Sequence, residues 1–382
     1  MRRADWTLRT GGSLVLLVGM LFTVASAEPV VLPPVWTEAQ WVQHLISAPV
    51  DKGEQMEMGY HLLARTNVRP LLGSTAVEQP FAGEHGYYRF ASLSEIRLCL
   101  PRWQVSYAFG VADRFEGDQG AVHLYLGGVD QMQLPSTDTD VSATLNRSAV
   151  NRWTVEHLVP LHREPDNGWL LLAGSLYLSR RIQQGTLIGR WQNAQFDGNL
   201  LLDTTLGLNP AQTRSTGWGI HLALSLPLSE RWRLGFWGEN LLGELRQRRI
   251  QRITARVLAN TIVPDADGFL HAAPLLSGRI DHLAEDLCWQ RKLTLGMAYR
   301  QAKGTWLLFA SHGAEQEFSV GYASPRYWVL FSLPRAEWQL AYHAGQCELV
   351  MGLSSLNPSQ AKHATLSLRW SAPLGCKHPY HR

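Results

Sequence analysis

The chain has 382 residues, enough for one large β domain or two ordinary ones, and 18% are charged, against roughly 25% in an average soluble domain. A net charge of +3 is too small to indicate a nucleic-acid partner, and no nucleic-acid-binding motif occurs. The sequence also lacks a G-x-S-x-G nucleophile elbow, an H-E-x-x-H zinc motif and a phosphate-binding loop. We therefore expect no enzyme, no cofactor and no metal site.

Residues 1–27 have the three parts of a secretory signal peptide. Three arginines lie within a charged start, residues 14–24 form an apolar core, and residues 25–27 (Ala-Ser-Ala) form a small-residue cleavage site. A transmembrane helix would need about 20 apolar residues, and this stretch is too short. No later apolar run reaches that length, so a membrane-embedded mature protein would have to cross as a β-barrel.

Residues 28–90 are the least periodic part of the chain. Thr37 is placed to cap a short helix through Ile46, because Trp41, Leu45 and Ile46 fall on one helical face. The remainder is broken by proline and glycine. This N-terminal irregular or helical segment could be a periplasmic leader, a plug inside a barrel, or an irregular first strand or two.

From residue 94 the apolar residues recur with a period of two, as they do in half-buried β-strands. In 217–226, the cleanest segment, Trp218, Ile220 and Leu222 share one face and His221 lies on the other. The phase of the pattern changes at Pro101, which indicates a bulge or a tight connection. With 94–109 taken as one bulged strand, the segments number about fourteen, an even number as bacterial barrels require, and 153–158 is a further candidate. The others are 121–127, 169–178, 186–192, 199–208, a strand that starts at Trp232, 292–300, 305–311, 317–322, 327–333, 338–343, 347–353 and 365–370.

Alternation is also typical of a soluble β-sandwich, so other features must separate the two architectures. Short turns join most neighbouring strands, and the faces opposite the apolar ones mix small residues with Arg, Glu and His, which suits a polar lumen. Aromatic residues lie near strand ends, where an interfacial girdle would be: Trp103, Trp218, Trp232, Tyr299, Tyr342 and Trp370. We predict an all-β fold, an antiparallel up-and-down transmembrane β-barrel of about 14 strands (12–16), over residues 91–370. A secreted soluble β protein is the alternative.

Loop parity supports this prediction. If the final strand ends at Trp370 on the periplasmic side, the short turns at 227–230, 301–304, 324–326 and 344–346 are also periplasmic. The long segment 240–291 is then external, where long loops belong. The turns at 312–314 and 334–336 are external too, although they are short for that side.

The segment 240–291 carries the candidate site residues. Five arginines form a dense basic stretch, with apolar residues between them at helical spacing: Arg246, Arg248, Arg249, Arg252 and Arg256. In one interpretation, a folded-in helix or an extended ribbon places these guanidinium groups at a pore mouth, where they attract anions or lipid phosphate. In the interpretation we prefer, the segment is a solvated loop or a long strand whose arginines face the lumen.

Residues 371–382 are expected to form a C-terminal tail. The four cysteines, Cys99, Cys288, Cys347 and Cys376, lie in a chain bound for an oxidising compartment, where disulfides can form. Three pairings can be drawn, and the sequence does not choose among them. Unpaired thiols that face lipid or lumen are equally consistent.

Residues 235–243, with the sequence GFWGENLLG, resemble a strand-to-loop passage of barrels similar to the conjugal-transfer TraF type and the fatty-acid transporter FadL type. More generally, residues 91–370 resemble bacterial outer-membrane barrels. The FadL-type resemblance implies about fourteen strands and an N-terminal plug for hydrophobic substrates.

We expect an outer-membrane channel or transporter for small or hydrophobic solutes. Outer-membrane lipid and the barrel-assembly machinery would be its partners. The alternatives are a non-conducting structural or assembly barrel that binds an envelope partner, and the secreted soluble protein.

Overall fold

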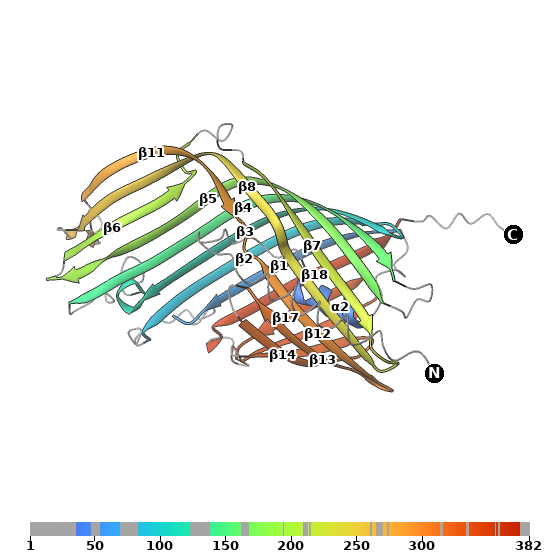
Figure 1. Cartoon of the computed structure of the whole chain (residues 1–382). Coiled ribbons are helices and arrows are strands. Elements are labelled where there is room, and N and C mark those ends of the chain that lie inside the picture. The colour runs from blue at the N-terminus through green and yellow to red at the C-terminus, as the bar shows by residue number, and fades with distance from the viewer. Residues whose placement is uncertain are drawn as a thin grey trace, which may run out of the picture.

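In the computed structural model the chain forms a closed antiparallel β-barrel of 14 strands, which confirms the predicted fold class (Figure 1). None of the helices in the described part of the chain has the length and apolar character needed to cross a membrane. The structure describes residues 36–46, 54–68, 83–122, 138–161, 168–193, 195–208, 213, 215–259, 262–264, 270–272, 275–313, 316–333, 336–355, 357 and 360–374. The expected signal peptide lies outside these residues.

The wall of the barrel is an up-and-down meander, as predicted. Its strands are β1 (Gln55–Thr66), β2 (His85–Cys99), β3 (Trp103–Asp118), β4 (Thr139–Pro160), β5 (Trp169–Gln192), β7 (Ser215–Pro227), β8 (Trp232–Ala259), β12 (Lys292–Gln301), β13 (Gly304–His312), β14 (Gln316–Ala323), β15 (Tyr327–Leu333), β16 (Glu337–Ala344), β17 (Cys347–Leu353) and β18 (His363–Pro373). Each strand pairs with the next one in this order, and β18 pairs with β1 to close the wall. All backbone groups between strands can therefore be satisfied without an open edge.

The two ends of the barrel differ. The short connections after β2, β7, β12, β14 and β16 and the first and last wall-strand residues lie at one end, the turn end. The predicted parity of the short turns is met there. Gly345, with φ of 60°, occupies the tight β16–β17 turn, where a left-handed backbone favours glycine. The opposite end, the loop end, has the longest connections and also the short ones after β13 and β15.

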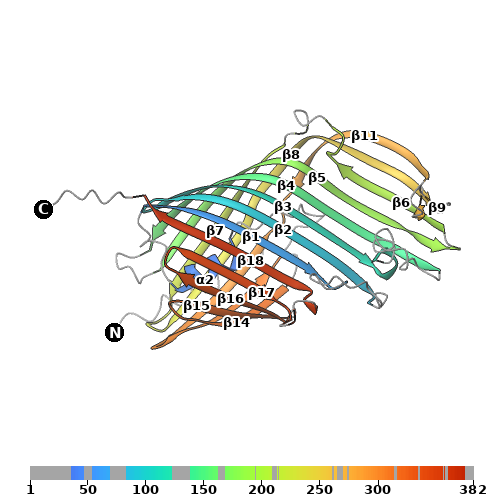
Figure 2. The same cartoon turned by 180° about the vertical axis from the view of Figure 1, so that it is seen from behind.

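At the loop end the wall continues outward as a sheet (Figures 1 and 2). β5 and β8 have 24 and 28 residues, whereas about 9–11 suffice to cross a bilayer. Beyond β7, their distal parts both pair with β6 (Gln195–Thr204), and β8 also pairs with β11 (Leu275–Cys288). We call β6, β11 and these distal parts the loop-end extension. A two-stranded ribbon of β9 (Ile262–Pro264) and β10 (Leu270–Ala272) lies between β8 and β11 in the chain.

The outward face of the wall carries an aromatic belt at the turn end. Trp232, Tyr299, Trp306 and Tyr322 are direct register partners across four adjacent strands. The ring centroids of Trp232 and Tyr299 are 4.6 Å apart, and those of Trp306 and Tyr322 are 5.4 Å apart. Leucine, isoleucine and valine occupy the exposed outward positions further along the strands. This arrangement is typical of a barrel surface that faces lipid.

Three expectations about boundaries were wrong. The wall begins at Gln55, not at residue 91, because β1 lies inside the segment expected to be irregular. Pro101 separates two strands, β2 and β3, and does not mark a bulge within one. At the C-terminus β18 runs to Pro373, because Ala372 and Pro373 still pair with β1, so the tail starts later than residue 371.

The strand count was right, although some of the predicted strands are not separate strands of the wall. β5 is one strand where two were expected, 199–208 corresponds to β6 outside the closed wall, and residues 119–122 are helical where 121–127 was expected to be a strand. The predicted number of strands still agrees with the observed one, because other strands were missed: β1, β4, and one of the two strands, β2 and β3, into which 94–109 divides. β4 had been represented only by the candidate 153–158.

The segment 240–291 is a ribbon for most of its described length. β8 continues to Ala259, and β11 returns antiparallel to it after the β9–β10 ribbon. A bulge between Leu283 and Glu285 shifts the register. The interpretation as an irregular loop was wrong for residues 240–259 and 275–288, whereas the alternatives of an extended ribbon or a long strand describe them.

Candidate functional site

A helix lies inside the barrel. α2 (Glu38–Ile46) begins where Thr37 and Gln40 form a reciprocal cap: the Thr37 backbone N–H donates to Gln40 Oε1 at 2.7 Å, and the Gln40 N–H donates to Thr37 Oγ1 at 3.4 Å. The sequence predicted Thr37 as the cap and Ile46 as the end of the helix, but not the part of Gln40. Figures 1 and 2 show α2 within the wall from both sides. The segment predicted to contain a plug candidate thus places a helix in the lumen.

The apolar face of α2 packs on an apolar side of the lumen. Trp41 stacks near Trp237 of β8, with ring centroids 6.4 Å apart, and His44 meets Trp169 of β5 edge-on at 5.4 Å. Trp36, which precedes the helix, has no exposed surface. Trp36, Trp41 and Trp237 belong to one buried apolar cluster that also includes residues of β4, β5, β7 and β12–β17. The lumen is therefore filled at the level of α2.

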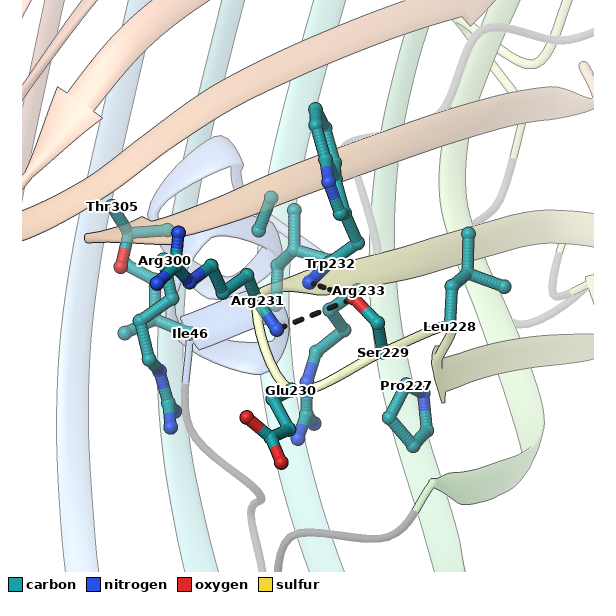
Figure 3. A pocket seen from close by; sticks show the side chains of 12 residues that line it. Ile46, Pro227, Leu228, Ser229, Glu230, Arg231, Trp232, Arg233, Arg300 and Thr305 are labelled. Atoms are coloured by element: carbon teal, nitrogen blue, oxygen red, sulfur yellow. Dashed lines mark hydrogen bonds between the residues drawn. The ribbon is translucent and has the colours of Figure 1, made fainter.

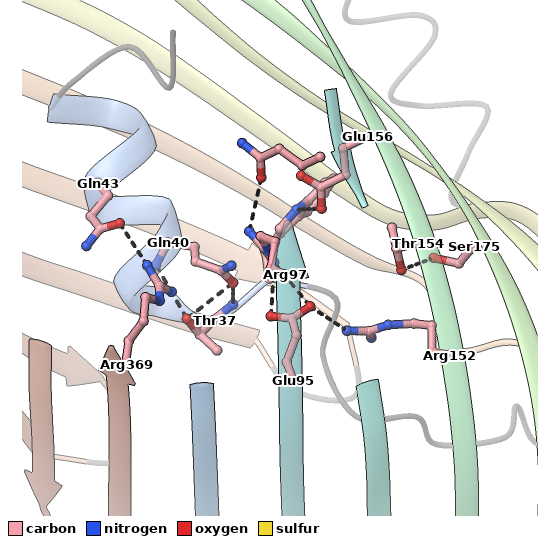
Figure 4. Close-up of polar contacts among 12 residues, drawn as sticks. Thr37, Gln40, Gln43, Glu95, Arg97, Arg152, Thr154, Glu156, Ser175 and Arg369 are labelled. Atoms are coloured by element: carbon pink, nitrogen blue, oxygen red, sulfur yellow. Dashed lines mark hydrogen bonds and ion pairs between the residues drawn. The ribbon is translucent and has the colours of Figure 1, made fainter. Parts of the chain in front are cut away.

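The polar face of α2 bonds to side chains of β16, β17 and β18 (Figure 4). Gln43 Nε2 donates to Glu348 of β17 at 2.9 Å, and Arg369 of β18 donates to Gln43 Oε1 at 2.9 Å. Glu38 accepts a hydrogen bond from Gln339 of β16 at 3.0 Å. These polar contacts, together with the apolar ones, hold α2 inside the lumen.

Arg65 of β1 lies at the centre of an ion cluster with the helix. Its guanidinium lies 3.8 Å from Glu38, 3.2 Å from Glu317 of β14 and 3.4 Å from Glu337 of β16. Burial would raise the pKa of the Glu38 carboxyl, but the positive charges of Arg65 and Lys292 outweigh burial and hold that pKa below its ordinary value. Glu38 is therefore a carboxylate at neutral pH and attracts the cations of the wall.

A second buried network joins β2 and β4 next to the start of the helix (Figure 4). Arg97 and Arg152 share Glu95 at 3.0 and 3.9 Å, and the indole of Trp36 donates to Glu156 at 3.3 Å. A charged wall of this kind would be costly in an apolar core but suits a lumen that water or polar solutes can enter.

A buried serine and histidine form a pair that cannot act as a nucleophile and base. His221 Nε2 lies 2.8 Å from Ser175 Oγ, and the backbone N–H of Asn240 donates to His221 Nδ1 at 2.9 Å. Because Nδ1 accepts a hydrogen bond, the ring proton is on Nε2, which then donates to the serine. The imidazole cannot take the serine proton in this arrangement. The pair is structural.

The five predicted site arginines lie in the loop-end extension and are not brought together. Arg252 pairs with Asp203 and Glu285 at 2.7 and 2.9 Å, and Arg256 pairs with Asp197 at 2.6 Å. Arg246, which is 79% exposed, lies 4.0 Å from Asp286. Arg248 is exposed and Arg249 is half-buried. The strong pairs of Arg252 and Arg256 hold strands together, and a role of the five at a pore mouth stays a prediction.

A recess of about 510 Å³ opens at the turn end beside the C-terminal residues of α2 (Figure 3). Arg231 and Arg233 of the β7–β8 turn region and Arg300 of β12 line it, together with Glu230. Leu45 and Ile46 form its apolar side. No local sequence pattern unites these arginines, because the strand register that brings them together joins residues far apart in the chain.

Cys99 is buried and Cys347 is exposed, and neither takes part in a disulfide. Within the described residues no group of three or more His, Cys, Asp or Glu side chains is arranged to hold a metal ion.

No protein-family model matches the sequence, and no curated protein matches it. Among solved structures, the chain is similar to the toluene transporter TodX of P. putida, with 10% identity and a TM-score of 0.43 over 90% of this chain and 94% of that one. It is also similar to the translocator domain of autotransporter NalP from Neisseria meningitidis, with 8% identity and a TM-score of 0.35 over 95% of each chain.

At these identities and TM-scores, neither likeness bears on what this chain does. The class of protein is defined by the strand pairing that closes the barrel and by the apolar surface on its outward face. The protein is a transmembrane β-barrel with a short helix across its lumen.

Proposed function

We propose that this protein is an outer-membrane channel or transporter for small or hydrophobic solutes, and that α2 is its plug. The observation that carries the proposal is the helix held across a charged lumen by separate apolar and polar contacts. A barrel that served only as a structural wall would need no such separate element. Outer-membrane lipid and the barrel-assembly machinery would be its partners.

The closed barrel, its aromatic belt and the signal-peptide pattern support an outer-membrane location. Closed barrels with an outward apolar band are one of the two architectures that span bilayers. The loop-end extension would project from the membrane, because its strands continue well beyond the length a bilayer requires.

Passage through the lumen would require α2 to move. Trp36, Trp41 and Leu45 are nearly inaccessible, so little space remains between the helix and the wall at their level. The polar contacts of Gln43 can be exchanged for water at small cost, because a water-mediated bond is nearly as favourable as a direct one. A displaced helix leaves all pairing between wall strands intact.

Conductance of the full-length protein in planar bilayers tests this proposal. Trp41→Ala removes the ring that contacts Trp237 and lies 4.2 Å below the Lys292 ammonium, so we expect larger or longer openings than in the unsubstituted protein. Gln192→Ala, at the exposed β5–β6 turn, is the matched control and should conduct like the unsubstituted protein.

If the folded unsubstituted protein and the Trp41→Ala variant both fail to conduct, and vesicles that contain them take up no solute, the proposed channel function is wrong. The non-conducting structural barrel would then be the better account. Heat-modifiable migration on a gel confirms in each case that the barrel was folded.

A further inference from the structure

We infer that the turn-end recess binds an anion through Arg231, Arg233 and Arg300, the bound group being a phosphate or a carboxylate. This inference deepens the proposed function. Its consequence for permeation rests on that function, whereas the test of anion binding does not. Of the described residues that line the recess, these three carry positive charge and only Glu230 carries negative charge. The recess therefore has a surplus of positive charge.

The strand register brings the three guanidinium groups to one place. The Arg300 backbone N–H donates to the Arg231 carbonyl at 2.7 Å, which fixes the end of β12 against the start of β8. Arg233 is the register partner of Ala298. It lies two residues after Arg231 along the chain, so its side chain is on the same side of the strand. Figure 3 shows the three arginines and Glu230 around the recess below α2.

Arg231 and Arg300 differ from the other arginines near the lumen. Arg65, Arg97, Arg152 and Arg369 each have a carboxylate within 4.0 Å, the limit for an ion pair. Within the part of the chain that the structure describes, neither Arg231 nor Arg300 has such a partner, and both are exposed. Grouped like charges repel one another, so an anion that enters between them relieves the repulsion.

The recess also has the shape and donors that an anion requires. Guanidinium groups bind carboxylate and phosphate through paired N–H donors in a fixed geometry. Ser229 and Thr305 add hydroxyl groups to the lining. A volume of about 510 Å³ is in the range of small-ligand sites. Its position beside Ile46 means that a bound anion lies at the mouth of the plugged lumen.

In a conducting barrel, this site would favour anions at the turn-end mouth. At roughly 0.1 M salt the field of these arginines reaches about 10 Å, which covers the recess. Replacement of Arg231 and Arg300 by glutamine should therefore lower the ratio of anion to cation permeability several-fold, measured from the reversal potential under a salt gradient.

Site binding is tested without any conduction. Full-length protein in neutral detergent is labelled with phenylglyoxal, which modifies arginine, and peptide mass spectrometry gives the rate at each residue. We expect inorganic phosphate, at equal ionic strength to a chloride reference, to slow labelling of Arg231 and Arg300 several-fold. Arg246, which is also exposed and lies toward the opposite end of the barrel, is the internal control and should be labelled at the same rate in both salts.

Two further comparisons show which source supplies the anion, and whether a negative result counts against the anion site or against the channel. Protein in phosphatidylglycerol vesicles, compared with phosphatidylcholine vesicles in phosphate-free buffer, shows whether a lipid phosphate protects the same residues. Protection by either source supports the site. In the R231Q/R300Q variant, neither source should still protect Arg233 from labelling. Equal labelling rates with chloride, phosphate and both lipids would overturn the inference. Protection without conductance would uphold the site and reject the channel.

Discussion

Asn240 has a positive φ of 52° within β8, a left-handed conformation that strains most side chains and that asparagine tolerates better than other residues with a side chain. Its side chain offsets that strain, because Oδ1 accepts a hydrogen bond from the Tyr177 hydroxyl at 2.8 Å and Nδ2 donates to the Gln290 carbonyl at 3.2 Å. The sequence contains no signal for this conformation. It depends on residues of β5 and of the segment before β12, which only the closed barrel brings together.

We expect Asn240→Ala to lower the free energy of unfolding by roughly 2–4 kcal/mol, from a buried hydroxyl left without its acceptor and from the left-handed backbone. Denaturant titration in detergent measures this loss. Asn240→Gly removes the same hydrogen bonds without the steric strain and should cost less. Equal losses in the two variants would show that the backbone strain contributes nothing.

Asp197 and Arg256 form an exposed ion pair in the loop-end extension. Hydrogen bonding from the Arg256 guanidinium, with its positive charge, lowers the pKa of the Asp197 carboxyl below its ordinary value of 3.8. A carboxyl whose pKa is lower in the folded state stabilises that state above the unfolded pKa, and the stabilisation is lost as pH falls through the folded pKa.

We therefore expect the pair to be complete at neutral pH and to weaken only below about pH 3.8. Arg256→Gln should return the pKa of Asp197 toward its ordinary value, as measured by NMR titration of the carboxyl carbon. An unchanged titration in this variant would contradict the assigned cause.

At the level of elements, α2 was predictable because its signals are local. The Thr37–Gln40 cap and the spacing of Trp41 and Leu45 are contained within ten residues of sequence. β4 was poorly predicted because its distal half leaves the membrane-spanning wall. There Arg147 and Asp113 pair on the outward face, where lipid would demand apolar residues, and the alternation is lost.

Arg252 joins three strands of the loop-end extension, since its guanidinium bonds to Asp203 of β6 and to Glu285 of β11. Arg252→Ala should reduce hydrogen-exchange protection in β6 and β11 while that of β12–β18 stays unchanged. The loss should amount to about 1 kcal/mol or less, because the guanidinium is partly exposed. Arg248→Ala is the matched control on the same strand, since Arg248 is exposed. Equal protection in all three proteins would mean that the Arg252 pairs do not hold the extension.

For the whole molecule, the period of two predicted the class and the lipid-facing surface, because these depend on the repeated local pattern of every strand. It could not predict what fills the lumen. The contacts of α2 join residues about 300 positions apart, such as Gln43 and Glu348. The recess likewise depends on the β8–β12 register, which brings Arg231 and Arg300 together. Both the contacts of α2 and the turn-end recess therefore depend on contacts between residues distant in the sequence, and not on the local alternation of apolar and polar residues.

The depth of each outward residue in the membrane yields the most direct test of the fold as a whole. Leu340 lies in the middle of β16 with 48% of its surface exposed, and Tyr342 lies two residues nearer the turn end on the same face. Arginine at the bilayer midplane costs about 2–4 kcal/mol, whereas at the interface it costs about 0–1 kcal/mol.

Leu340→Arg should therefore lower the free energy of unfolding in lipid vesicles by about 2–4 kcal/mol, and Tyr342→Arg by about 1 kcal/mol or less. The two variants share strand, face and introduced side chain, so the difference between them isolates depth. In a soluble barrel both positions would face water and the two losses would be similar and small. A Leu340→Arg protein as stable in vesicles as the Tyr342→Arg protein would mean that this face does not contact lipid. The belt of Trp232, Tyr299 and Trp306 would then need another explanation.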